Sequence, residues 1–575
     1  MALNDPTEWS TVNLPVPGYG SIDGLCFDGK STQYLGIPYA TIPGRFRRPQ
    51  PATAPWPEHR WDGTKLGPFC PQPPRDYYPL PSPQRPWLQD PTPSETECLN
   101  LNITVPFAPG SPEIEREGLP VFIFIHGGAF TYGTGASPMY DGRVLANISR
   151  DDESSPTIII TLNYRLGLFG FLASEQIQSY NRAHGEDGVG NYGIWDQIEA
   201  LRWIHNNIRA FGGDPDRITL SGQSAGSVSV NLHLLRNEPL FSRAILQSGL
   251  VPLCGVMSVD EYQAVYDKTL KALGISSSLC AEERFTRLLD SESTALVTGM
   301  VDVFMTPVIT LALCNDHVLI PRSMPTYSDF NEFSLPEWCH DVVIGDAKHE
   351  CIIWNKAYRH LTAAELISRC TEIVGIDAAN RILDLYHIKP EMSKVDIFYA
   401  IEKLATDGMY LAMNYDAMRA HPRSFAYHFD EPSLYDTDWQ GLAHHSFENI
   451  FIWSVIRNTL LEKQKAQSRR IAGLWLRFVA GGEPWPRFGS HQQVMIFGPN
   501  GQASMRPTSD DADRGYSRWD ALRRENLLDD FGRLSDELCI NRASIINPNV
   551  EPKAMKVSDL DEGIKGRQMT AIGLM

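Results

Sequence analysis

The sequence of 575 residues contains no stretch of about 18 uninterrupted apolar residues, so we expect no transmembrane helix. Its first 30 residues are polar and broken by proline and glycine, without the basic start and apolar centre of a secretory signal. With Met1 as the natural first residue, this pattern predicts a cytoplasmic protein. The alternative is a secreted protein whose signal precedes Met1 of this sequence.

Positive charge and metal-binding patterns are also scarce. The chain has 51 Lys and Arg against 69 Asp and Glu, a formal net charge of -18. An acidic surface disfavours nucleic acids and anionic membranes as partners. The ten cysteines show no C-x-x-C or Cys/His spacing typical of zinc, so we expect no metal. There is no internal repeat, low-complexity tract or Gly/Ser linker that would indicate separable modules.

A serine between two glycines is the most informative feature that the sequence does contain. The segment Gly222-Gln223-Ser224-Ala225-Gly226 fits the G-x-S-x-G pattern of a nucleophile elbow, a tight turn from a strand into a helix. Such patterns recur by chance in long chains, but here the β-branched run Ile218–Leu220 precedes the turn and small residues follow it. The context therefore predicts that Ser224 is a nucleophile held above a sheet.

A second glycine motif follows a predicted buried strand. The apolar run Val121–Ile125 leads directly into His126-Gly127-Gly128. Glycines there leave backbone N–H groups unobstructed, so Gly127 and Gly128, with the N–H of Ala225, could donate to a carbonyl oxygen that gains charge. Each such donor contributes about 3 kcal/mol to catalysis. The alternative is a plain glycine turn after a core strand, and the neighbouring elbow motif favours an oxyanion hole.

These motifs, together with others in the same order, resemble the type-B carboxylesterase family, which includes cholinesterases, liver carboxylesterases and fungal lipases; we expect a fungal-type member. Further matching segments are Leu35–Ala40, Arg45–Phe46, Asn163–Gly167, Gly190–Gln197, Phe211–Pro215 and Gln247–Gly249. The resemblance implies an α/β-hydrolase fold, with a mostly parallel, twisted central sheet, flanking helices and large inserted loops and helices. It also implies one domain over residues 1–545, followed by a polar tail over 546–575.

The resemblance implies that the catalytic acid and base follow the serine, each after a strand. Glu350 stands at the family's glutamate position, after the apolar segment Val342–Gly345. The family usually continues with glycine, whereas this chain has Cys351. Asp346 is a second candidate for the acid, although a turn aspartate at a strand end is the preferred interpretation for it.

The segment Gly441–Glu448 resembles the family's histidine loop, in which the histidine precedes an acidic residue by three positions. That spacing selects His445, whereas counting from Gly441 would select His444. In the implied roles, His445 accepts the proton of the serine and returns it to the leaving group, and Glu350 fixes the tautomer of the imidazole.

Three other features follow from the resemblance. Ser248 matches a serine that forms a hydrogen bond near the catalytic glutamate. Gln223 stands where many relatives have glutamate, so cations should be attracted less strongly than in cholinesterases. Cys70 and Cys98 match a pair that closes a loop in secreted relatives, so a disulfide is compatible with the sequence; in a reducing cytosol they would stay thiols.

The walls of the substrate gorge are expected in two regions. The proline-rich segment 71–93 predicts a stiff wall, and its Trp87 lies near the position of the family's gorge tryptophan. A cation-π role is one interpretation of Trp87, and a general aromatic wall is the preferred one. Phe130 and Phe304 are apolar candidates for the lining, with ordinary core packing as the alternative. Helical patterns at 261–273 and 282–289 precede Phe304.

The sequence thus predicts an enzyme that cleaves small carboxylic esters through an acyl-enzyme on Ser224, without any cofactor. It also predicts a preference for short to medium acyl groups. One alternative is an acyltransferase or lactone-forming enzyme that uses the same three side chains. Another is a non-catalytic scaffold protein, which retention of the serine, glutamate and histidine disfavours. The oligomeric state cannot be read from the sequence.

Overall fold

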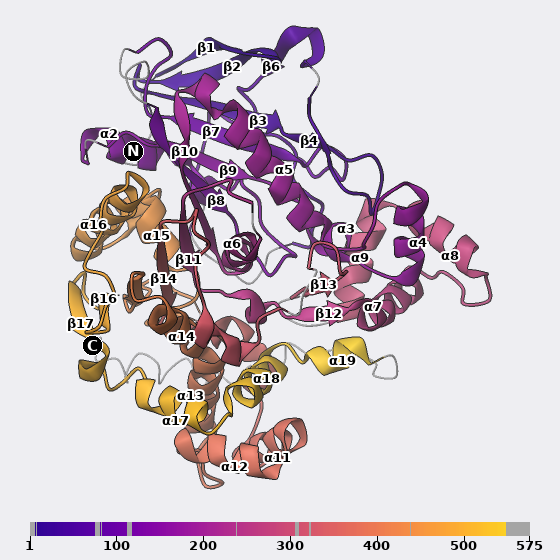
Figure 1. Ribbon diagram of the computed structural model, residues 1–575, viewed down its shortest axis with the longest axis vertical. Helices are drawn as coiled ribbons and strands as arrows, with labels where there is room; N and C mark the ends of the chain where they lie inside the picture. Colours follow the sequence, from indigo (N-terminus) through magenta and orange to yellow (C-terminus); the bar gives the residue numbers. More distant parts are fainter. Residues whose placement is uncertain are drawn as a thin grey trace.

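The computed structural model describes residues 6, 8–53, 55–74, 81, 83–111, 118–153, 155–236, 238–304, 310–320, 324–437 and 439–547. Within these ranges a single large sheet runs through the molecule, and helices cover both of its faces (Figure 1). The predicted tail, 546–575, lies outside the described residues except for its first two positions, where the last helix ends at Ile546.

The main sheet has 13 strands within the described residues, in the order β1-β2-β3-β7-β9-β8-β10-β11-β14-β15-β16-β17, with β6 paired to β2. The strands are β1 (Trp9–Val16), β2 (Gly20–Phe27), β3 (Ser31–Pro38), β6 (Arg60–Asp62), β7 (Asn100–Val105), β8 (Leu119–Ile125), β9 (Ile158–Leu162), β10 (Gly213–Gln223), β11 (Arg243–Gln247), β14 (Asp341–Ala347), β15 (Phe425–Phe429), β16 (Gln493–Phe497) and β17 (Ala503–Pro507). Two short pairs, β4 (Ala40–Thr41) with β5 (Gln50–Pro51) and β12 (Val256–Ser258) with β13 (Leu313–Asn315), lie outside it.

The centre of the sheet is parallel and its edges are antiparallel. Strands β9, β8, β10, β11, β14, β15 and β16 run parallel, whereas β1, β2, β3, β7 and β17 pair antiparallel with their neighbours in the strand order; the short β6 pairs parallel with β2. Parallel strands covered on both faces read as continuous apolar runs, which explains the unbroken runs in β8 and β9. The predicted mostly parallel central sheet is therefore confirmed.

The helices are α2 (Gly142–Asp151), α3 (Gly167–Phe171), α4 (Glu175–Ala183), α5 (Tyr192–Asn207), α6 (Ala225–Leu235), α7 (Val259–Ala272), α8 (Ala281–Leu289), α9 (Ser293–Phe304), α10 (Asn355–Tyr358), α11 (Ala363–Val374), α12 (Ile376–Leu385), α13 (Lys394–Thr406), α14 (Ala412–Ala420), α15 (Glu448–Trp453), α16 (Glu462–Val479), α17 (Tyr516–Arg524), α18 (Leu528–Cys539) and α19 (Arg542–Ile546). The helical patterns predicted at 261–273 and 282–289 correspond to α7 and α8.

Strand β8 shows how the sheet separates two cores. Its side chains alternate between the faces, as the period of two in a strand requires. Val121, Ile123 and Ile125 join the larger core, which includes α5 and α6. Phe122 and Phe124 join the smaller core with α2, α15 and α16. Figure 1 shows these two sets of helices on opposite sides of the sheet. No helix among the described residues is long and apolar enough to cross a membrane.

Candidate active site

Ser224 occupies a sharp turn between β10 and α6. Its backbone has φ 58° and ψ −126°, a conformation that a residue with a side chain rarely adopts. The flanking glycines are required by space: a Cβ on Gly222 would lie 2.2 Å from the carbonyl oxygen of Gly226, and one on Gly226 would lie 2.1 Å from that of Ile125. The Ser224 N–H donates to the Gln247 carbonyl at 2.9 Å, which ties the turn to β11.

The glycine loop after β8 lies directly against this turn. A Cβ on Gly127 would lie 2.9 Å from the Cβ of Ser224, and Gly128 has a φ of +113°. Gly127 and Gly128 line the same cavity as Ser224. Ala225 is the first residue of α6, so its N–H belongs to the helix donors that have no acceptor within the helix. The arrangement thus gathers glycine and helix-terminal N–H groups around the serine.

His445 and Glu350 lie together beside the serine. The Nδ1 atom of His445 is 2.5 Å from Oε2 of Glu350, and both side chains are buried. The second oxygen of Glu350, Oε1, accepts a hydrogen bond from the Ala347 N–H at 2.7 Å. A carboxylate at Nδ1 holds the proton on that nitrogen, so the lone pair of the neutral ring is at Nε2.

Backbone pairing of two loops brings the acid and the histidine together. The His349 N–H donates to the Ala443 carbonyl at 2.9 Å, and the His445 N–H donates to the His349 carbonyl at 3.3 Å. This short bridge aligns the loop after β14 with the loop that follows β15. Glu350 and His445 therefore meet although they are 95 positions apart.

The alternative histidine, His444, faces away from the cavity. Its ring packs against Trp439 and Phe447, with centroids at 5.0 and 4.8 Å, and its Nδ1 lies 3.0 Å from the carbonyl oxygen of His445. Burial lowers the pKa of His444 to about 3, so it stays neutral.

The alternative acid, Asp346, belongs to a separate buried cluster. One of its oxygens is 2.6 Å from Nδ1 of His428, and the other accepts a hydrogen bond from Asn414 at 3.1 Å. Nε2 of His428 lies 2.7 Å from the hydroxyl of Tyr516. Because both of its oxygens are engaged there, Asp346 is not placed to orient His445.

Two further polar side chains lie near the pair of Glu350 and His445. The Ser248 N–H donates to the Gly345 carbonyl at 2.9 Å, but its buried hydroxyl has no hydrogen-bond partner among the described residues, so the hydrogen bond implied by the resemblance is not formed. Glu448, which served in the sequence only to count the spacing of the histidine loop, is a buried carboxyl. Burial and the nearby charge of Glu350 raise the pKa of Glu448 to about 8.

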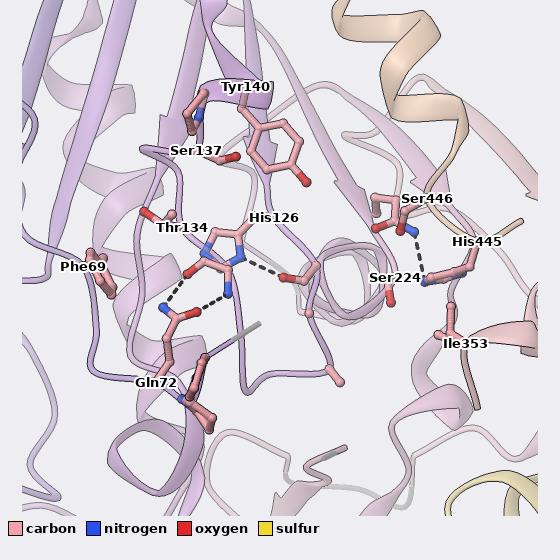
Figure 2. Close-up of a pocket in the computed structure, with 18 of the residues that line it drawn as sticks. Phe69, Gln72, His126, Thr134, Ser137, Tyr140, Ser224, Ile353, His445 and Ser446 are labelled. Carbon is pink, nitrogen blue, oxygen red and sulfur yellow. Dashed lines mark hydrogen bonds between the residues drawn. The ribbon is translucent and has the colours of Figure 1, made fainter. Parts of the chain in front are cut away.

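These groups surround a cavity of about 430 Å³. The described lining consists of Phe69, Gln72, Pro73, Pro74, His126, Gly127, Gly128, Ala129, Gly133, Thr134, Ser137, Pro138, Tyr140, Gln223, Ser224, Ile353, Trp354, His445 and Ser446. Figure 2 shows Ser224 and His445 on one side and His126 on the other, with the hydroxyl of Tyr140 directed into the space between them. None of the described lining residues is Asp, Glu, Lys or Arg.

The beginning of the proline-rich segment forms one wall, and a glutamine fixes it in place. Phe69, Gln72, Pro73 and Pro74 line the cavity. The Gln72 amide accepts from the Gly133 N–H at 2.7 Å and donates to the Gly133 carbonyl at 3.0 Å, which joins this wall to the glycine loop (Figure 2).

The three aromatic residues predicted for the gorge do not line this cavity. Trp87 packs on Phe27 and lies 4.3 Å below the guanidinium of Arg143, so its face is already used by a cation of the protein itself. Phe130 is fully buried and stacks on Phe171 at 4.6 Å. Phe304 is buried in the core beside a void of about 10 Å³, apart from Ser224.

Other aromatic side chains take their place. Trp354 and Tyr140 line the cavity, and the ring centroid of Trp354 is 6.5 Å from that of His445. Neither residue was predicted from the sequence. Trp354 could have been found from its position four residues after Glu350, in the short 3-10 helix Cys351–Trp354 that follows the acid.

Cys70 and Cys98 are buried thiols in this structure. A hydrogen bond from the Cys98 thiol to the Cys70 sulfur, together with burial, raises the pKa of Cys98 well above its usual value. The Cys70 sulfur also accepts a hydrogen bond from the Leu166 N–H at 3.2 Å. The two side chains therefore lie beside each other, as the resemblance implied.

Comparisons with known proteins point to one family. The sequence model of the carboxylesterase family matches residues 10–506. The chain is 28% identical to the para-nitrobenzyl esterase of Bacillus subtilis over 506 residues, 82% of this chain and 91% of that protein. It is 27% identical to lipase 3 of Yarrowia lipolytica over 549 residues, 93% of this chain and 99% of the lipase.

A solved structure agrees with these sequence matches. The crystal structure of a carboxylesterase from Geobacillus stearothermophilus superposes with a TM-score of 0.69 and 26% identity, covering 88% of this chain and 99% of the other. The fold is therefore the α/β-hydrolase fold. Bacterial and yeast proteins both occur among these relatives, so fungal-type membership stays a prediction.

Proposed function

We propose an acyl-enzyme mechanism on Ser224 for this chain, which belongs to the carboxylesterase family and is a carboxylic ester hydrolase. In this proposal His445 is the general base, and Glu350 holds its ring in the productive tautomer. The supporting observation is the 2.5 Å contact between Glu350 and His445, with His445 lining the same cavity as Ser224.

The chemistry follows from these positions. The Ser224 oxygen attacks the carbonyl carbon of the ester while Nε2 of His445 takes the hydroxyl proton. The carbonyl oxygen becomes an oxyanion, which the N–H groups of Gly127, Gly128 and Ala225 stabilise as donors. The tetrahedral intermediate collapses, the bond to the alcohol breaks, and His445 gives its proton to the leaving oxygen. Water then repeats the sequence on the acyl-enzyme and releases the acid.

The nucleophile is tested by covalent labelling with a fluorophosphonate. Wild type should incorporate one label per chain and lose esterase activity, whereas Ser224→Ala should not be labelled and should lose activity by about 10⁴-fold or more. The matched control is Ser446→Ala, which removes another hydroxyl from the same cavity and should still be labelled. Labelling of Ser224→Ala at the wild-type rate would refute the assignment, and failure to label wild type would favour a non-catalytic scaffold.

Substrate size is tested with p-nitrophenyl esters of graded acyl length. Because the cavity of about 430 Å³ is bounded by proline-rich and aromatic walls, we expect kcat/KM to be highest for short to medium acyl groups. A steady increase out to long fatty acyl chains would contradict this. Product analysis in the presence of an added alcohol distinguishes hydrolysis, which releases the free acid, from acyl transfer, which forms a new ester.

A further inference from the structure

The proton-accepting nitrogen of His445 already has a partner in the substrate-free structure. The side-chain amide nitrogen of Gln223 lies 3.1 Å from Nε2 of His445. Nδ1 of the same ring faces Glu350, so Nε2 is the nitrogen with a lone pair, and the amide N–H of Gln223 donates to it. Gln223 is 2% exposed, so water does not compete effectively for this hydrogen bond.

The other end of the amide lies against the glycine loop. A Cβ placed on Gly127 would lie 2.9 Å from Oε1 of Gln223 and 2.5 Å from its carbonyl oxygen, so the glutamine side chain lies directly against the glycine loop. Its backbone ends β10, in register with Gln247 of β11. The Gln223 amide thus lies between the loop with the expected oxyanion donors and the ring of the base.

We propose that Gln223 is a positioning residue whose amide caps Nε2 of His445 and holds the ring as a neutral imidazole until the Ser224 hydroxyl takes its place at that nitrogen. This inference rests on the proposed function, because it assigns a task to the neighbour of the proposed base. An amide N–H can donate only to the unprotonated nitrogen, so this contact stabilises the neutral ring and opposes its protonation. A carboxylate at the same position would do the opposite, because it would accept from the imidazolium.

The other groups around His445 would not mask the effect of residue 223 on protonation of the ring. Glu350 contacts the far nitrogen, and Trp354 and Tyr410 cover the ring with centroids at 6.5 and 5.4 Å. Burial raises the pKa of Tyr410 well above its usual value, so this residue is neutral.

The nearby carboxyl of Glu448 has a pKa of about 8, His444 stays neutral, and His349 faces Glu402 at 3.1 Å. His126 lines the opposite wall of the cavity. Below about pH 8, where Glu448 is uncharged, a charge introduced at position 223 would therefore act on His445 next to the carboxylate of Glu350.

The experiment compares the pH dependence of kcat/KM for wild type and Gln223→Glu with a short p-nitrophenyl ester. We expect the acid-side midpoint of the profile to move up by about 1–3 pH units, the range for an opposite charge within contact distance. The pH dependence of fluorophosphonate labelling should move by the same amount, because both report protonation of the free enzyme. A midpoint within about 0.3 units of wild type would overturn the proposal.

Two further variants separate the causes. Gln502→Glu adds the same charge at an exposed turn between β16 and β17 and should leave the midpoint unchanged. Gln223→Met keeps the length of the side chain without a donor or a charge; it should raise the acid-side midpoint above that of wild type, because it removes the hydrogen bond that opposes protonation of Nε2. A wild-type midpoint in this variant would also overturn the proposal. If Ser224→Ala remains active, the proposed function itself fails, and this result is independent of position 223.

Discussion

Glu448 shows how a single residue near the pair of Glu350 and His445 affects the molecule. It is buried, one of its carboxyl oxygens has no hydrogen-bond partner among the described residues, and the other is 3.5 Å from the amide of Gln247. Burial and the proximity of Glu350 raise its pKa from 4.5 to about 8. Near neutral pH the folded protein therefore keeps a proton on Glu448 that the unfolded chain has released.

This difference makes stability depend on pH. Between about pH 4.5 and pH 8, the contribution of Glu448 to the free energy of unfolding decreases as the pH rises, because the folded state binds more protons than the unfolded state. Glu448→Gln lacks this group, so the stability of wild type relative to the variant should fall by roughly 1.4 kcal/mol per pH unit. Denaturant unfolding of both proteins at pH 5, 6.5 and 8 measures how this difference in the free energy of unfolding changes with pH. The control Glu462→Gln, at an exposed position, should show the same pH dependence of stability as wild type. The same pH dependence in Glu448→Gln and wild type would contradict the prediction.

At the scale of elements, a buried ion pair fixes the segment after β9 to α5. The Arg165 guanidinium contacts both oxygens of Asp196, at 2.7 and 2.8 Å, and donates to the Arg47 carbonyl at 2.7 Å. Both side chains are at most 2% exposed. Removing one partner of such a pair leaves a buried charge unpaired, and this costs far more than removing both.

We therefore expect Arg165→Met to lower the free energy of unfolding by about 3–5 kcal/mol, because Asp196 would remain buried without its cation. The double variant with Asp196→Asn should recover part of that loss. Urea unfolding of both variants and of Asp196→Asn alone gives the interaction energy directly. If the double variant is the sum of the two single changes, the pair makes no specific contribution.

At the scale of the whole molecule, the last described helix connects the C-terminal part to the core. Lys268 of α7 donates to the carbonyls of Ser544 and Ile545 at 2.9 Å each, and Arg542 pairs with Asp536 at 2.8 Å. Ile545 is buried in the larger core. These contacts end at Ile545, near the predicted boundary between the domain and its polar tail, which stays a prediction.

Two truncations test this boundary. A chain that ends at Asn547 should keep the Tm and esterase activity of the full chain, because the contacts of α19 remain. A chain that ends at Ile540 should have a Tm lower by at least about 3 °C, because it loses the partners of Lys268 and exposes α7. Thermal unfolding measures the Tm of both truncated chains. A large loss in the longer chain would show that residues beyond 547 belong to the folded domain.

The sequence located features that depend on local chemistry. The strand before Ser224, the two elbow glycines and the glycine loop after β8 could be found because a tight turn and a buried strand each impose a pattern over a few neighbouring residues. Distinguishing His445 from His444, or Glu350 from Asp346, depended on a resemblance, because each pair differs by only a few positions in the chain. In the structure, the bridge between the two loops separates them, since it turns His445 toward Glu350 and leaves His444 against Trp439.

The residues predicted for the gorge also depend on contacts that the local sequence does not show. No local sequence pattern distinguishes an aromatic residue that lines a cavity from one that packs elsewhere. In the structure Trp87 lies against Arg143, Phe130 lies against Phe171, and Phe304 lies beside a core void. By itself the sequence determined the fold, the family and the position of the serine turn, because hydrophobic period and glycine geometry act over short distances. Only the tertiary structure decided the partner of each histidine, the residues of the cavity wall and the contact between Gln223 and His445, because these depend on distances between segments far apart in the chain.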